Sequence, residues 1–149
     1  LIPDQFKLTW DLHEMRMLLE PEIAYRAATN IAEGQLDRLR EMCDEMERLS
    51  EQRKERMPLD VEFHICLAES SGNLVVPKLI PVLRQGVELF IKYTHREATP
   101  ESVAKHRDIL EALEARDPQW AKDMMLMHLT YNSQEIRREA IRRGVMYDL

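Results

Sequence analysis

Residues 12–28 read LHEMRMLLEPEIAYRAA, and this stretch carries the pattern that decides the fold. Its inward-facing positions recur at steps of three and four residues and are Leu12, Arg16, Leu19, Ile23 and Ala27. Such spacing is typical of an amphipathic helix with one buried stripe. We expect a helix over about residues 9–29, and because Pro21 lies inside it, we expect the helix to kink or split there.

The same periodicity continues along the chain and predicts about five more helices, at residues 33–51, 58–70, 73–94, 100–115 and 118–143. Asp117 and Pro118 have the residue types preferred at a helix start, and Gly72 and Gly144 those preferred after a helix end. The stretch 73–94 is apolar almost all round, which favours a place in the middle of a bundle. No segment alternates like a strand, so the predicted fold is all-α, an antiparallel bundle of about six helices.

Composition and charge narrow the class of protein. The 149 residues fit one domain, and they are 44% hydrophobic and 32% charged, with a formal net charge of −6. This acidic balance argues against a nucleic-acid surface on the chain itself. No apolar run approaches the roughly 20 residues that span a bilayer, so we expect no membrane segment. Cys43 and Cys66 lie inside helical patterns, which favours reduced thiols and a cytoplasmic protein.

Four residues stand out as metal-ligand candidates, namely Asp60, His64, His106 and His128. Asp60 and His64 are four positions apart and therefore share one helix face. His106 and His128 each fall on the inward stripe of their own helix. Since every buried imidazole needs a partner, three that face one core favour a metal site. The alternative is that each histidine is a core residue with its own hydrogen bond. His13 and His95 lack such neighbours, and we expect both to be exposed.

Arg16 is the second anomaly, because it occupies the buried stripe of the first helix. A buried guanidinium needs either an acidic partner or an anionic ligand. The acidic side chains that could pair with it inside the core are Glu20, Glu62 and Glu69. Asn132 follows His128 by one turn and would place an amide beside the same site. Arg84, on the mostly apolar fourth helix, is a further candidate for ligand binding.

These residues resemble the C-terminal effector domain of the GntR superfamily in its FadR-like branch, the FCD domain. Residues 12–28 are similar to the opening motif of that family, an Arg followed by Leu-Glu-Pro and then alanines. Residues 60–73, with Asp-Val-Glu-Phe-His and Ser-Gly-Asn, are similar to its second motif, and residues 106–129 to its third. The resemblance runs from about residue 12 to residue 138, and the three motifs occur in order.

The resemblance implies a set of roles for these residues. Asp60, His64, His106 and His128 would hold one divalent ion, as in the metal-binding members of the family. Zinc is the first expectation from ligand type, and nickel, iron and manganese suit the same donors. A small carboxylate or hydroxy-acid effector would complete the coordination. The residues expected to bind that effector are Arg16, Asn132 and Arg84.

The resemblance also implies the place of this chain in a larger regulator. Members of the family carry an N-terminal winged helix-turn-helix, and residues 1–149 show no trace of one. We therefore expect one sensing domain over residues 1–149, with DNA bound only through the other domain and a homodimer in the intact regulator. We expect no enzyme activity. The main alternative is a helical metalloenzyme with Glu62 or Glu69 as general base, and a third is a metal-free helical interaction module.

Overall fold

The computed structural model describes residues 2–55, 57–95 and 99–145, with side chains from residue 5 onward. Within these residues the chain forms six α-helices, one short 3₁₀ helix and no strand, which confirms the all-α prediction. The elements are α1 (Ile2–Asn30), α2 (Glu33–Glu51), α3 (Met57–Glu69), η1 (Val76–Leu79), α4 (Ile80–Thr94), α5 (Pro100–Glu114) and α6 (Pro118–Arg142).

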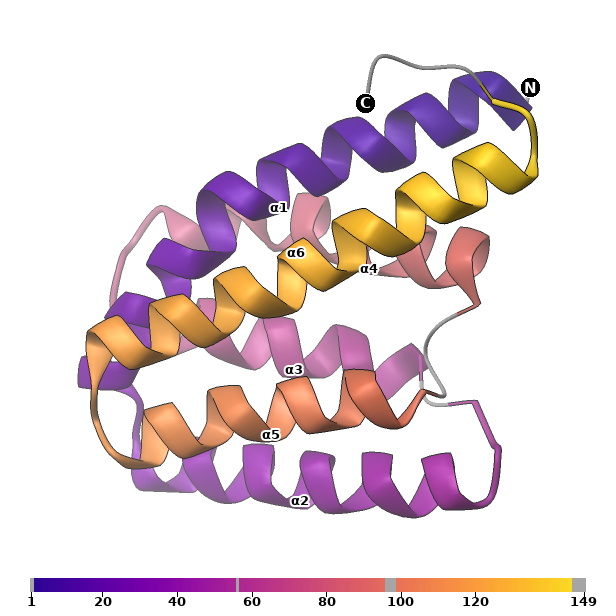
Figure 1. Cartoon of the computed structure of the whole chain (residues 1–149). Helices are drawn as coiled ribbons and strands as arrows, with labels where there is room; N and C mark the ends of the chain where they lie inside the picture. Colours follow the sequence, from indigo (N-terminus) through magenta and orange to yellow (C-terminus); the bar gives the residue numbers. More distant parts are fainter. Residues whose placement is uncertain (1, 56, 96–98, 146–149) are drawn as a thin grey trace.

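The two longest helices, α1 and α6, lie side by side and run antiparallel across one face of the bundle (Figure 1). Below them α5 and α2 form a second antiparallel pair, while α3 and α4 lie behind (Figure 1). In sequence order the chain folds back at each connection, so consecutive helices from α1 to α3 and from α5 to α6 are antiparallel. This arrangement surrounds one interior with α1, α3, α5 and α6.

Helix ends follow the residue types at the boundaries. Asp117 caps α6 by accepting a hydrogen bond from the backbone N–H of Trp120, and Thr99 caps α5 in the same way from Ser102. Gly144 follows α6 with φ of 66°, a left-handed conformation that glycine adopts without strain. The predicted ends of α2, α3, α5 and α6 therefore agree with the structure to within one residue.

Helix α1 begins at Ile2 rather than near residue 9 as predicted, and it does not split at Pro21. It runs unbroken from Ile2 to Asn30, although Pro21 cannot donate the backbone hydrogen bond that the helix would otherwise make there. A proline inside a helix costs about 3 kcal/mol. The helix continues because the stripe on both sides of Pro21 is buried against the bundle. Arg16 and Glu20 before it and Ile23 and Ala27 after it are at most 4% exposed.

The fourth predicted helix was wrong in its start and in its surroundings. It begins at Ile80 rather than at residue 73, after the separate 3₁₀ helix η1. Pro77 and Pro81 explain this break, since neither has the backbone N–H that a continuous helix starting at residue 73 would need at these positions. The segment is also not buried on all sides, because Leu74 is 90% and Val75 60% exposed. Apolar composition alone does not place a helix at the centre.

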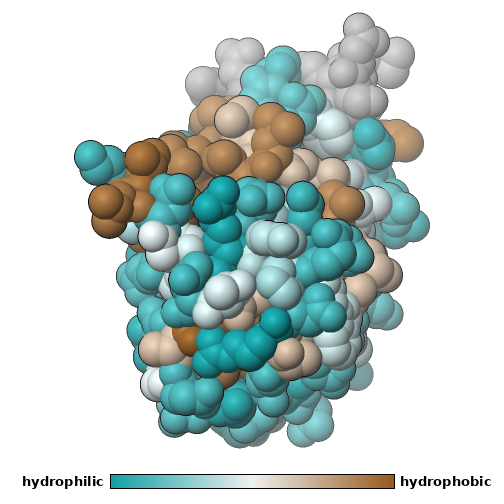
Figure 2. All heavy atoms as spheres, turned by 90° about the vertical axis from the view of Figure 1, so that its left-hand side faces the viewer, coloured by the Kyte–Doolittle hydropathy of each residue, from teal (hydrophilic) through white to brown (hydrophobic). Residues whose placement is uncertain are grey.

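The surface retains large hydrophobic side chains. Figure 2 shows a band of hydrophobic residues across the upper part of one side of the molecule. The exposed large hydrophobic residues on α1, on the segment leading into α4 and at the start of α4 are Leu8, Met15, Leu18, Tyr25, Leu74, Val75 and Val82. Among the described residues, no helix is long and apolar enough to cross a bilayer. Cys43 and Cys66 are free thiols inside the core.

Candidate metal and effector site

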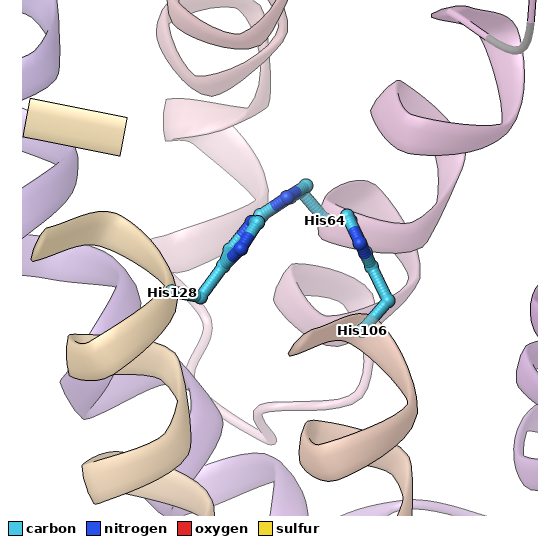
Figure 3. A group of neighbouring side chains, drawn as sticks. All are labelled: His64, His106 and His128. Carbon is cyan, nitrogen blue, oxygen red and sulfur yellow. The ribbon is translucent and has the colours of Figure 1, made fainter. Parts of the chain in front are cut away.

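Three histidines from three different helices meet in the interior of the bundle. His64 comes from α3, His106 from α5 and His128 from α6, and their rings face one another (Figure 3). One ring nitrogen from each lies within 4.8 Å of the others, and all three residues are buried. Asp60, one turn before His64 on α3, is 4% exposed and belongs to the same cluster. The predicted four residues are therefore brought together.

The contacts of His106 define which of its nitrogens faces the cluster. Its Nδ1 lies 2.7 Å from the carbonyl oxygen of Ser102 and must carry the proton, because a carbonyl only accepts. Its Nε2 lies 3.3 Å from Oδ1 of Asp60. A neutral His106 would thus turn a lone pair towards a carboxylate, which is repulsive unless a proton or a cation lies between the two atoms.

His64 is held from the opposite side by a carboxylate on α1. Its Nδ1 contacts Oε1 of Glu20, and Oε2 of the same carboxylate lies 2.6 Å from Nε of Arg16. Glu20 is 2% exposed. Burial by itself raises the pKa of Glu20, but Arg16 and His64 overcome it and lower the pKa to about 2. Glu20 is therefore ionised at neutral pH.

His128, like His106, is 2% exposed. Burial, followed by the neighbouring His106 and His64, lowers its pKa well below the usual value for histidine. Its ring lies 4.6 Å from that of His106 and 5.5 Å from that of His64, measured between centroids. Its Nδ1 is buried and makes no hydrogen bond. His128 is consequently a neutral imidazole that can offer a lone pair.

A small cavity adjoins this cluster. Its polar wall contains Arg16 and Asn132 besides the four candidate ligands, and its apolar wall comes from α4. The α4 residues in that wall are Val87, Phe90 and Ile91. The volume open to the centre of a water molecule is about 10 Å³, which holds about one water molecule. Arg16 is 1% exposed, and its Nη1 makes no hydrogen bond.

The donor set fits a divalent transition metal. Imidazole nitrogens and a carboxylate oxygen are ligands of zinc and its neighbours. Two ligand atoms that each lie about 2.1 Å from a tetrahedral ion are about 3.4 Å apart. The distance between Oδ1 of Asp60 and Nε2 of His106 is 3.3 Å, which agrees with this value. Glu20 and the Ser102 carbonyl hold the far nitrogens of His64 and His106, as outer partners of metal-bound histidines do.

Comparison with known proteins places this arrangement in a family. The model of the FCD domain matches residues 11–131. The chain belongs to the FCD domain family. A solved GntR structure from Streptococcus agalactiae shares 36% identity, with a TM-score of 0.75 over 88% of this FCD domain and 60% of that chain. The resemblance and the fold predicted from the sequence are thereby confirmed.

Two curated relatives are regulatory proteins by name. A putative L-lactate dehydrogenase operon regulatory protein of Escherichia coli K12 is 24% identical over 144 residues, covering 93% of this chain and 55% of its own length. The uncharacterized HTH-type transcriptional regulator YcbG of Bacillus subtilis 168 is 33% identical over 121 residues, covering 79% and 50%. This FCD domain thus spans about half the length of the curated relatives it matches.

The structure separates the predicted effector residues of this FCD domain into two groups. Arg16 and Asn132 line the cavity. Arg84 does not: its side chain is 45% exposed and its Nη2 lies 3.4 Å from Oε1 of Glu62. Arg16 forms an ion pair through its Nε with Glu20, one of the three acids considered from the sequence. Its Nη1 makes no hydrogen bond and is therefore available to a ligand.

The prediction that His13 is exposed was wrong, whereas His95 is exposed as expected. His13 is 1% exposed, and its Nε2 lies 2.7 Å from Oγ of Ser133 on α6. Burial, and then the nearby charge of Arg16, lower its pKa to about 3. The sequence contains a pattern that predicts the burial of His13, because His13, Arg16 and Glu20 follow one another at steps of three and four residues and therefore share one helix face.

Proposed function

We propose that this FCD domain senses a small monocarboxylate at a divalent metal ion, most simply zinc, held by Asp60, His64, His106 and His128. The single observation that supports this best is the meeting of three buried imidazoles with Asp60. The ion would supply a Lewis acid that binds a carboxylate oxygen of the effector. Nickel, iron and manganese suit the same donors.

Charge balance argues for one carboxylate rather than several. A divalent ion and Arg16 bring three positive charges, and Asp60 and ionised Glu20 bring two negative ones. One positive charge remains inside a cavity where net charge is costly, and a monocarboxylate cancels it. Arg16 would bind the effector through its Nη1, a charge-assisted bond, and the amide of Asn132 would hold a hydroxyl or carboxylate oxygen.

The rest of the effector would contact the apolar wall formed by α4. Val87, Phe90 and Ile91 offer no hydrogen-bonding side chain, which favours a short hydrocarbon substituent there. A cavity with room for about one water molecule is smaller than any carboxylate, so binding has to displace part of this wall. The movement of α4 that results would be the signal passed on.

The regulatory context is proposed from the relatives. One is named for an L-lactate dehydrogenase operon, which agrees with a small hydroxy acid as effector. We propose that the intact regulator is a cytoplasmic homodimer that binds DNA through a separate N-terminal domain. A coupling free energy of about 1–3 kcal/mol between effector and DNA is enough for regulation.

The alternative function, a metalloenzyme at the same ion, lacks support at the cavity. Glu62 and Glu69 were its candidates for the general base. Glu62 is 41% exposed and pairs with Arg84, while Glu69 is exposed. Neither residue is among those that line the cavity, and we therefore expect no catalysis.

The experiment is to measure metal content and carboxylate binding on the same protein. Elemental analysis after purification without chelator should show about one transition metal per chain, and added zinc should raise the melting temperature of the stripped protein. His106→Ala should abolish both, whereas His95→Ala, at an exposed histidine, should change neither. Calorimetry should then show that the metal-loaded protein binds L-lactate and that it binds succinate or citrate more weakly. A stripped protein that neither binds zinc nor gains stability from it would disprove the proposal.

A further inference from the structure

The carboxylate of Glu20 joins the two halves of the site. One of its oxygens contacts Nδ1 of His64, and the other lies 2.6 Å from Nε of Arg16. Arg16 and Glu20 lie one turn apart on α1, and His64 lies on α3. All three side chains are at most 3% exposed, so water does not replace either contact. Glu20 is thus the direct link between a candidate metal ligand and the candidate effector anchor.

These contacts determine the proton on His64. An ionised carboxylate only accepts hydrogen bonds, so Nδ1 of His64 must carry the proton. A neutral imidazole then keeps its lone pair on Nε2. The other oxygen of Glu20, Oε2, accepts a hydrogen bond from Nε of Arg16, and Nη1 of Arg16 makes no hydrogen bond.

We infer that Glu20 is a positioning residue that fixes the tautomer and orientation of His64 for metal binding and aims Arg16 at the effector. This inference rests on the proposed function. It adds that the affinity of the metal ion depends on a residue that does not touch it. Mutation of a residue that hydrogen-bonds a metal-bound histidine typically lowers metal affinity by about 10–100-fold.

A glutamine at position 20 separates this role from simple packing. Its amide has almost the shape of the carboxylate but only one accepting oxygen. The charged guanidinium of Arg16 is the stronger donor and should take that oxygen. The NH₂ group would then face His64, whose Nδ1 would have to accept, so the proton would move to Nε2 and block the metal-binding lone pair.

Three variants test the inference by zinc competition with a chromophoric chelator. Glu20→Gln should lower zinc affinity about 10–100-fold. Glu135→Gln is the matched control, since Glu135 is equally buried and pairs with an arginine, Arg138, away from the cavity. It should leave zinc affinity unchanged. Adding Arg16→Met to Glu20→Gln frees the amide oxygen for His64, so the double variant should regain most of the lost affinity.

The tautomer is measured directly by ¹⁵N spectroscopy of the imidazoles in metal-free protein. In the wild type His64 should carry its proton on Nδ1, and in Glu20→Gln on Nε2. This measurement on the wild type decides the matter even where the variant does not fold, because a proton on Nε2 of His64 would overturn the inference. So would a Glu20→Gln protein that binds zinc as the wild type does. A wild type that binds no zinc would instead refute the proposed function while leaving the tautomer result readable.

Discussion

Gly86 on α4 lies directly against the side-chain stem of Arg16 on α1. A β-carbon at position 86 would stand 2.7 Å from Cδ of Arg16 and 3.2 Å from Cγ. The absence of a side chain on Gly86 therefore makes room for a buried arginine. This contact joins the helix that carries Arg16, the proposed effector anchor, to the helix that forms the apolar wall of the cavity.

Gly86→Ala should consequently destabilise the protein and weaken carboxylate binding. Overpacking a buried position costs about 1–3 kcal/mol, and the displaced part is the middle of the Arg16 side chain rather than its flexible end. Gly34→Ala on α2 is the control, because nothing lies within 4 Å of its added β-carbon. That change should stabilise by up to about 1 kcal/mol, since alanine favours helix over glycine. Denaturant unfolding of both variants checks the prediction, and equal effects would contradict it.

Arg16→Met should leave zinc content unchanged and lower carboxylate affinity by about tenfold or more, the 1.4 kcal/mol of one charge-assisted bond. It should also destabilise the metal-free protein by about 3–5 kcal/mol, because Glu20 would remain buried without its cation. Arg84→Met, at an exposed arginine outside the cavity, should do neither. Loss of stability with unchanged carboxylate binding would assign Arg16 a structural role alone. Calorimetry and thermal unfolding separate these results.

Metal affinity should fall as the pH decreases below about 6.5, because imidazoles must be neutral to coordinate. His128 is already neutral in the folded protein, since burial and its histidine neighbours hold its pKa well below the usual value. At most two of the three imidazoles therefore release a proton when the ion binds. The logarithm of the zinc affinity should change by no more than about two units per pH unit between pH 5 and pH 6.5. A flat profile would argue against histidine ligation, and a slope of three against a neutral His128.

His13 should make the metal-free protein sensitive to acid. Its pKa is lowered from 6.5 to about 3 in the folded state, so below pH 6.5 the unfolded chain binds a proton that the folded chain does not. The stability contributed by a neutral His13 is therefore complete above pH 6.5 and is lost as the pH falls towards 3. From pH 7 to pH 5 the loss should be about 2 kcal/mol.

His13→Gln tests this prediction, because glutamine can still bond Ser133 but does not titrate in this range. The free energy of unfolding of this variant should decrease about 2 kcal/mol less than that of the wild type between pH 7 and pH 5. Both proteins are measured in chelator, so that protonation of the metal ligands contributes equally. Parallel curves would show that His13 is not buried as a neutral base.

Much of this protein could be predicted from its sequence because the information is local. The spacing of apolar residues at three and four positions, the Asp117 cap and the Gly144 stop depend only on neighbours within a turn or two, and they placed four of the six helices to within one residue. The metal candidates were predictable for the same reason: each histidine lies on the apolar stripe of its own helix.

Other features depend on contacts between distant parts of the chain, and only the tertiary structure decided them. The sequence left the partner of Arg16 open among three acids, and packing selected Glu20, whose second oxygen reaches His64 on another helix. His13 is buried because α6 covers it, whereas one face of α4 is exposed because no helix in the described part of the chain packs against it. Helical periodicity says which side of a helix is apolar, but burial depends on whether another helix packs there.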